Sequence, residues 1–272
     1  VVGAVEHLHR GAAPQRFEGS FLDVFDTVTK VVIYENTQQE AEARFEAIHA
    51  LLIEYHKLSD IYNEYDGVNN AATINANAGK APVAVDEKLI DLLEYAKEMY
   101  AATDGKMNIA MGSVLSVWHE YREEGIADPE NAALPPMETL REAAGHTDID
   151  KLVIDRAAGT VYLADEAMSI DLGAIAKGYA AQRVVEAMKA EGVSSLLLSV
   201  GGNVCSIGGR ADGKSWKVQV ESPWGGDALA TVGVNDLCLV TSGNYQRRYE
   251  VDGQYYHHII DPETLMPSLY FA

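Results

Sequence analysis

The 272-residue sequence predicts an α+β fold: a mixed, largely antiparallel sheet with flanking helices. Helical patterns dominate the first half of the chain, and short strand patterns dominate the second half. The two kinds of pattern do not alternate strictly, as a doubly wound parallel sheet would require. With 47% hydrophobic residues, the chain can bury a sizeable core, so one large domain or a domain with a lobe is expected.

The first half contains one strand pattern and several helical patterns. Residues 21–34 alternate and are rich in β-branched and aromatic types, which predicts a strand. Apolar residues at helical spacing predict helices, two of which begin after a possible capping residue, Thr37 and Asp86. The expected helices cover residues 37–62, 86–102, 111–124 and 137–144, with an Asn-rich loop over 63–77 and a second loop over 127–136.

The second half is expected to be β-rich around one amphipathic helix, residues 174–191. Asp252-Gly253 lies between two apolar runs and predicts a hairpin turn. The remaining expected strands lie near Val153 and Val161 and over residues 195–200, 203–207, 216–221, 229–234 and 237–241.

The charge and cysteine content limit the possible partners. A formal net charge of −20 argues against nucleic acid and anionic membrane surfaces. An anionic substrate must therefore be held by local groups or by a metal. The two cysteines, Cys205 and Cys238, lie in apolar strand-like segments, which favours buried free thiols over a disulfide. No stretch of the sequence is long enough to span a membrane.

The segment from Ser169 to Gly209 carries the most informative motif. Asp171 closes a short apolar stretch, and Lys177 stands where an amphipathic helix begins. The free N–H groups and the dipole of a helix start favour an anion such as phosphate, and Asp171 beside them could hold a metal or a proton. A plain helix packed on a strand, with a lysine at its edge, fits the same pattern.

The motif DLGAIAKGYA, followed about twenty residues later by SVGGNV, resembles the signature of the ApbE family, the FAD:protein FMN transferases. Three more blocks occur in the family's order, TDGKMNIAMGSVLSVWH (103–119), VTSGNYQRRY (240–249) and HHIIDPETLMP (257–267). The resemblance extends from about Phe21 onward and implies a T-fold-like architecture. It also implies FAD as substrate and Mg²⁺ as metal.

The resemblance implies a set of flavin-binding residues. Lys106, Met107 and Asn108 stand where the family commonly has a sequence close to AFD, and Asn108 replaces its aspartate. A plain interhelical turn is the alternative for this segment. Tyr65 is either a lid on the core or an aromatic that packs on the flavin ring. Phe25 lines the same pocket or belongs to a core strand.

The strongest implied roles fall on the DLGAIAKG block. Asp171 would contact the nucleotide and is a candidate catalytic residue, the Ala174 carbonyl would bind Mg²⁺, and Lys177 would lie beside FAD. Thr241 offers a loop hydroxyl, or simply caps a turn.

The two adjacent histidines, His257 and His258, should point to opposite faces of a strand. The family pattern selects His258 as the catalytic member, either as a base or as a contact to the nucleotide. Ile259 belongs to the same implied nucleotide-binding set.

The implied activity is Mg²⁺-dependent transfer of FMN from FAD to a threonine or serine of a partner flavoprotein, with release of AMP. FAD hydrolysis to FMN and AMP, and FAD binding without catalysis, are the alternatives. The implied acceptor is a flavoprotein subunit of a membrane electron-transport complex of the Rnf or Nqr type.

The resemblance also bears on the two ends of the chain. Residues 1–16 are small, polar and aperiodic, which suits a tether left after removal of a lipoprotein leader, or a cloning choice. The implied place is extracytoplasmic, in the bacterial cell envelope, with a lipid anchor in the cytoplasmic membrane. Residues 17–272 would form the flavin transferase domain. Relatives continue beyond Ala272 with an Asp-rich segment that completes the Mg²⁺ site, so a truncated C-terminus is expected.

Overall fold

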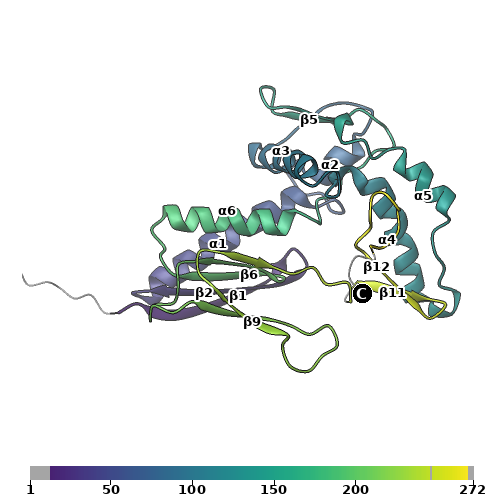
Figure 1. The fold of residues 1–272 in the computed structure, drawn as a ribbon. Coiled ribbons are helices and arrows are strands. Elements are labelled where there is room, and N and C mark those ends of the chain that lie inside the picture. The colour runs from purple at the N-terminus through teal and green to yellow at the C-terminus, as the bar shows by residue number, and fades with distance from the viewer. Residues whose placement is uncertain (1–12, 246, 269–272) are drawn as a thin grey trace, which may run out of the picture. The chain divides into compact units, whose positions relative to one another are not determined.

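The computed structural model describes residues 13–245 and 247–268, which belong to two compact units (Figure 1). Unit 1 comprises the described part of Val1–Ile53 together with Ala180–Thr241. Unit 2 comprises Glu54–Tyr179 and the described part of Ser242–Ala272. Most of the predicted tether, residues 1–16, lies outside the described residues. Its last two residues, Gln15 and Arg16, already belong to the first strand.

Unit 1 is built on a five-stranded antiparallel sheet with the strand order β1-β2-β6-β7-β10. The strands are β1 (Gln15–Val24), β2 (Thr27–Glu35), β6 (Leu196–Val200), β7 (Asn203–Ile207) and β10 (Cys238–Val240). A second, two-stranded sheet pairs β8 (Trp216–Val220) with β9 (Ala230–Val234). The predicted mixed, largely antiparallel architecture is confirmed.

The prediction of one strand over residues 21–34 is wrong, because this segment is a hairpin. Phe25 and Asp26 adopt φ values of 54° and 49°, so the chain reverses between β1 and β2. Positive φ at both central residues gives the turn that matches the twist of paired strands. Such turns usually contain Asn or Gly, so the sequence at Phe25-Asp26 carries no clear signal of reversal.

Parts of two long helices complete the core of unit 1. Figure 1 shows α1 (Gln38–Ser59) and α6 (Ala176–Ala190) running beside the sheet. Thr37 caps α1 as predicted: its hydroxyl accepts the N–H of Glu40, whose carboxylate accepts the N–H of Thr37. The fully buried apolar side chains of this core include Ile33, Ile48, Leu52, Ala180, Val184, Leu196 and Leu198.

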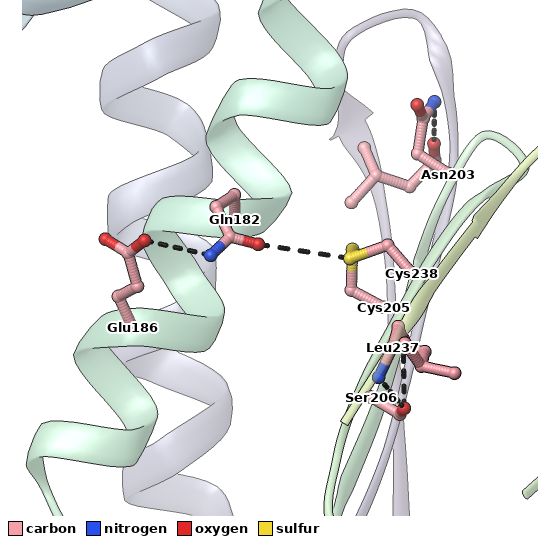
Figure 2. The surroundings of a disulfide bond; sticks show 8 residues. Gln182, Glu186, Asn203, Cys205, Ser206, Leu237 and Cys238 are labelled. Atoms are coloured by element: carbon pink, nitrogen blue, oxygen red, sulfur yellow. Dashed lines mark hydrogen bonds between the residues drawn. A yellow bond between two sulfur atoms is a disulfide. The ribbon is translucent and has the colours of Figure 1, made fainter. Parts of the chain in front are cut away.

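The two cysteines form a disulfide, so the prediction of buried free thiols is wrong (Figure 2). Strand β10 runs antiparallel to β7, and its register places Cys238 directly opposite Cys205, with Cα atoms 4.1 Å apart. Cys205 is buried, but Cys238 is exposed on the edge strand, where its sulfur lies 4.0 Å from Oε1 of Gln182. The pairing depends on strand register, which the local sequence does not specify.

Unit 2 combines short helices, a three-stranded antiparallel sheet and a hairpin. The sheet has the order β3-β5-β4, and the hairpin joins β11 to β12 through the predicted Asp252-Gly253 turn. The strands are β3 (Val83–Ala84), β4 (Leu152–Asp155), β5 (Thr160–Leu163), β11 (Arg248–Val251) and β12 (Gln254–His257). The α-helices are α2 (Ala71–Ala76), α3 (Glu87–Ala102), α4 (Gly112–Ala127) and α5 (Met137–Ala144). The short 3-10 helices are η1 (Ile109–Met111), η2 (Pro129–Asn131) and η3 (Ile149–Lys151).

The predicted Asn-rich loop over residues 63–77 contains α2, which the sequence pattern missed. Asn70 is buried and caps this helix, because its side chain accepts the N–H of Thr73 while Thr73 Oγ1 accepts the N–H of Asn70. This reciprocal pair stabilises a helix too short to show apolar periodicity. None of the helices in the described part of the chain is long and apolar enough to cross a membrane.

Candidate functional site

The turn between α3 and η1 carries the first block of predicted site residues. Asp104 and Gly105 have φ values of 49° and 81°, so the backbone reverses sharply after Thr103. The N–H of Met107 donates to Oγ1 of Thr103 at 3.0 Å, which ties both sides of the turn together. Lys106, at its tip, is exposed, and Met107 is half-buried. The turn therefore holds Lys106 at the surface on a braced backbone.

Both polar atoms of the Asn108 side chain form hydrogen bonds. Its Oδ1 accepts the N–H of Ala110 at 2.9 Å and caps η1, while its Nδ2 donates to the carbonyl of Thr147 at 3.0 Å. An aspartate could accept the first bond but could not donate the second. The contact to Thr147 thus gives a physical reason for an amide at this position.

Lys106 connects the first block to the last. Its Nζ lies 2.9 Å from Oε1 of Glu263 and 3.5 Å from Oδ1 of Asp261, whose side chain is buried. A cavity of about 380 Å³ opens beside these residues. Its lining residues come from segments 100–111, 144–148 and 262–263, and they include Tyr100, Lys106, Asn108, Thr147, Pro262 and Glu263.

The segment that contains Asp171 lies directly against the first block. The N–H of Asp171 donates to the carbonyl of Ile109 at 2.8 Å, and the N–H of Gly112 donates to the carbonyl of Ser169 at 3.1 Å. A Cβ at Gly112 would lie 2.5 Å from Ser169 O, so only glycine permits this approach. Three blocks that are far apart in the sequence therefore meet in unit 2.

The turn before α6 places the predicted metal and phosphate residues. Oδ1 of Asp171 accepts the N–H of Gly173 at 2.7 Å and so shapes the turn. Ala174 is exposed, and Lys177 is half-buried in the first turn of α6. Among the residues that the structure describes, no group of three His, Cys, Asp or Glu side chains could hold a metal ion.

His257 and His258 are both half-buried, and β12 ends at His257, but the two rings differ in their hydrogen bonds. His257 uses both ring nitrogens, because Nδ1 accepts the N–H of Ile259 at 3.2 Å and Nε2 donates to Ser268 O at 2.9 Å. The half-buried His258 has one such bond among the described residues, from Nδ1 to the carbonyl of Arg247 at 3.3 Å. Because a carbonyl only accepts, Nδ1 carries the proton and Nε2 presents a lone pair. His257 has a structural role, because both of its ring nitrogens bind backbone groups.

The pKa of His258 is shifted by its environment. Burial lowers the pKa below its usual value, and the positive charges of Arg247 and Arg122 lower it further, against the raising effect of the hydrogen bond to the Arg247 carbonyl. The imidazole is therefore neutral at pH 7 and can accept a proton at Nε2.

Two tyrosines, Tyr62 and Tyr65, follow α1, and the sequence analysis assigned a flavin-packing role to Tyr65 alone. The predicted Tyr65 is half-buried, and its hydroxyl donates to Oδ2 of Asp60 at 2.7 Å. Tyr62 was not predicted, although the residue is 70% exposed and its ring stands 5.8 Å from the ring of His119. Partial desolvation, followed by the negative charge of Asp171, raises the pKa of Tyr62. Tyr62 is therefore a second candidate for packing on a flavin.

The remaining predicted residues are divided between the units. Phe25 and Thr241 belong to unit 1, where Phe25 is half-buried at its positive φ and Thr241 is exposed immediately after β10. A bulky residue at positive φ is uncommon and marks a turn or a functional position. Ile259, in unit 2, is half-buried, and its carbonyl accepts the N–H of Ser268.

Sequence reasoning also missed two arginines close to His258. Arg122 lies on α4, and Arg247 lies just before β11. Helical spacing gives a signal for Arg122, which is four residues after the buried Trp118 on the same helix face. Strand alternation gives a signal for Arg247, which is two residues before the buried Tyr249.

The family model of the ApbE family matches residues 25–270 of the chain. A FAD:protein FMN transferase of Treponema pallidum is 34% identical over 261 residues, which is 90% of this chain and 69% of that protein. A protein of the same description from Klebsiella pneumoniae is 31% identical over 80% of this chain and 67% of its own length. The chain thus spans about two thirds of these two relatives.

Solved structures agree with the sequence comparison. The ApbE protein of Thermotoga maritima has a TM-score of 0.80 at 28% identity, and the match covers 93% of this chain and 79% of that one. The flavin transferase ApbE of Vibrio cholerae, at 20% identity, shares the fold with a TM-score of 0.73, over 93% of this chain and 78% of its own. The predicted resemblance is confirmed, and the chain belongs to the ApbE family, whose members include FAD:protein FMN transferases.

Proposed function

We propose that this chain transfers FMN from FAD to a threonine or serine hydroxyl of a partner flavoprotein and releases AMP. Family membership supports the reaction class. The observation that carries the proposal on this chain is the geometry of His258, whose Nδ1 is bound to the backbone carbonyl of Arg247 and whose Nε2 presents a lone pair. Burial lowers the pKa of this imidazole, which favours its neutral form.

In the proposed reaction, the acceptor oxygen forms a bond to the FMN phosphorus while the bond from that phosphorus to the AMP phosphate oxygen breaks. The hydroxyl proton passes to Nε2 of His258, and AMP leaves with the electron pair of the broken bond. A lowered pKa keeps His258 unprotonated before the reaction, as a general base requires. A role limited to binding the nucleotide is the alternative for His258.

The remaining predicted residues would hold the substrate. The cavity beside Lys106 and Asn108 offers a concave, polar site for part of the dinucleotide. Lys177 and the start of α6 offer a cation and free N–H groups for a phosphate. The segments that border or contact this cavity also carry Met107, Asp171 and Ile259.

Magnesium belongs to the proposal, with the Ala174 carbonyl as one ligand. When bound, Mg²⁺ would neutralise phosphate charge as the pyrophosphate bond breaks. The described residues supply exposed oxygen atoms at this turn but no clustered ligand set. The roles of His258 and the other residues are therefore derived without the metal.

We further propose that the acceptor is a flavoprotein subunit of a membrane electron-transport complex of the Rnf or Nqr type. The corresponding location is extracytoplasmic, in a bacterial cell envelope, through an anchor attached to the N-terminal tether. Localisation of a tagged native protein by membrane fractionation, with and without lipoprotein-processing inhibition, tests this part separately.

The decisive experiment incubates the protein with FAD, Mg²⁺ and such a flavoprotein subunit. Flavin fluorescence that stays on the acceptor after denaturation, together with AMP, supports the transferase. Free FMN and AMP without labelled acceptor would indicate a pyrophosphatase instead. Bound FAD that is recovered unchanged would indicate a binding module. An acceptor with its target threonine changed to valine is the matched control.

A further inference from the structure

One face of the β11–β12 hairpin packs on α4. Tyr249 of β11 pairs with Tyr256 of β12. The ring of Tyr256 stacks 6.5 Å from that of Trp118, and a Cβ at Gly125 would lie 2.5 Å from the Tyr249 ring. Trp118 Nε1 also donates to the carbonyl of Leu265 at 2.8 Å. The contact between helix and hairpin is therefore close.

Arg122 lies on the same stripe of α4. It follows Trp118 by four residues and precedes Gly125 by three, so the three positions share one helix face. Only 16% of its side chain is exposed. Its guanidinium donates to Nδ1 of His119 at 2.6 Å and lies 3.2 Å from Oε1 of the exposed Glu123. Arg122 is therefore held in place beside the hairpin.

Arg247 and His258 extend the same face of the hairpin beyond its strands. The N–H of His258 donates to the carbonyl of Arg247 at 3.1 Å, so these residues continue the pairing of Arg248 with His257. Alternation places Arg247 with Tyr249, and His258 with Tyr256, on the α4 side. Arg247 is exposed and makes no ion pair with any residue that the structure describes.

The electrostatic environment agrees with this geometry. Both arginines lower the pKa of His258, after the larger effect of its burial, and both act on Tyr62 against the raising effects of desolvation and Asp171. Two cations from distant parts of the chain thus act electrostatically on one histidine, in a protein whose formal net charge is −20. Such a concentration of positive charge favours an anionic ligand, and guanidinium groups suit phosphate oxygens in particular.

We infer that Arg122 and Arg247 bind the phosphate groups of FAD and hold them against His258. This inference rests on the proposed function, because it takes FAD as the substrate. The arginines would keep the phosphorus near the acceptor hydroxyl and stabilise the negative charge that AMP carries as it leaves. Glu123, at the solvent side of Arg122, offsets part of its charge, so Arg247 is expected to contribute at least as much.

The test measures flavin binding by fluorescence titration for the wild-type chain, Arg122→Gln, Arg247→Gln and the control Arg248→Gln. Arg248 is the next residue along the chain but lies on the other hairpin face, with its guanidinium 3.9 Å from the centre of the Tyr255 ring. FAD affinity should fall about tenfold in each of the first two variants and stay unchanged in the control. Affinity for riboflavin, which has no phosphate, should not change in any variant.

Several outcomes would overturn the inference. Unchanged FAD affinity in both arginine variants, an equal loss in the control, or an equal loss of riboflavin affinity would each exclude phosphate binding. Arg122→Lys separates charge from folding, since it should recover part of the FAD affinity if the charge matters. The titration does not require transfer, so a wild-type chain that binds FAD but labels no acceptor would overturn the proposed function alone. Absence of FAD binding by the wild-type chain would overturn both.

Discussion

The ammonium group of Lys106 lies 3.5 Å from Oδ1 of Asp261, a buried carboxylate 155 positions further along the chain. The same ammonium lies 2.9 Å from Glu263, and the N–H of Glu263 donates to Asp261. One side chain therefore fastens the turn after α3 to the segment that follows the two histidines. Both segments border the cavity at which we place part of the nucleotide.

Replacing Lys106 with methionine should lower the free energy of unfolding of unit 2 by about 1–2 kcal/mol, because a buried carboxylate loses a charged partner. The half-exposed lysine keeps the effect below that of a fully buried pair. Chemical denaturation measures the change, and Lys80→Met is the control, since Nζ of the exposed Lys80 donates to the backbone carbonyl of Ala76 and not to a carboxylate of the described residues. Equal stability of the two variants would show that the ion pairs of Lys106 do not stabilise unit 2.

The two tyrosines after α1 can be separated by flavin titration. Alanine at the residue that packs on the flavin should weaken FAD binding by roughly 1–3 kcal/mol, by analogy with stacking of bases on aromatic rings. The sequence selects Tyr65, but the structure favours Tyr62, whose ring is exposed while the Tyr65 hydroxyl is bound to Asp60. We therefore expect the larger loss in Tyr62→Ala. A larger loss in Tyr65→Ala would restore the sequence-based assignment.

His258→Asn should lower kcat strongly and leave FAD affinity nearly intact, if His258 is the base. Parallel loss of affinity and activity would instead indicate a nucleotide contact. His257→Asn is the internal control, and its effect should appear in stability, because both ring nitrogens of His257 bind the backbone. Loss of activity in the His257 variant alone would show that the roles are reversed.

The pH dependence of kcat gives a further prediction. A general base must be neutral, so a lowered pKa for His258 keeps the enzyme active below the usual histidine value of 6.5. Activity should then fall as the pH drops through the lowered pKa. Besides burial, the charged groups that lower it are Arg247 before β11 and Arg122 on α4, and the imidazole of His257 on β12 adds a contribution of the same sign. Removing Arg122 should therefore move this acid limb to higher pH, measured at saturating FAD, whereas an unmoved limb would exclude the coupling.

Reduction of the Cys205–Cys238 disulfide should destabilise unit 1 by about 2–4 kcal/mol, because the bond closes a loop across 33 positions in the unfolded chain. The midpoint of unfolding should fall when a phosphine reductant is added. A double alanine variant should unfold at the lower midpoint whether or not reductant is present. Two free thiols titrated in the untreated, denatured protein would show that the bond does not form.

The sequence by itself determined most elements of the fold and the blocks of the candidate site. Helices α1, α3, α4, α5 and α6 were predicted from apolar spacing and caps, which act over four residues or fewer and are visible in the chain. The Asp252-Gly253 hairpin followed from its turn residues in the same way. The resemblance between motifs then identified the family.

Tertiary structure decided which side chains that are distant in the sequence come into contact. The register of β10 on β7 formed the disulfide, the contact of α4 with the hairpin brought Trp118 to Tyr256, and Lys106 reached Asp261 only through the fold. Register and helix contacts depend on how buried surfaces fit together between segments that are distant in the sequence, and no local pattern encodes that fit. The Phe25-Asp26 turn and α2 were missed for a related reason. A hydrogen-bonded partner strand stabilises the turn and a buried asparagine cap stabilises the helix, whereas neither has a strong local signature.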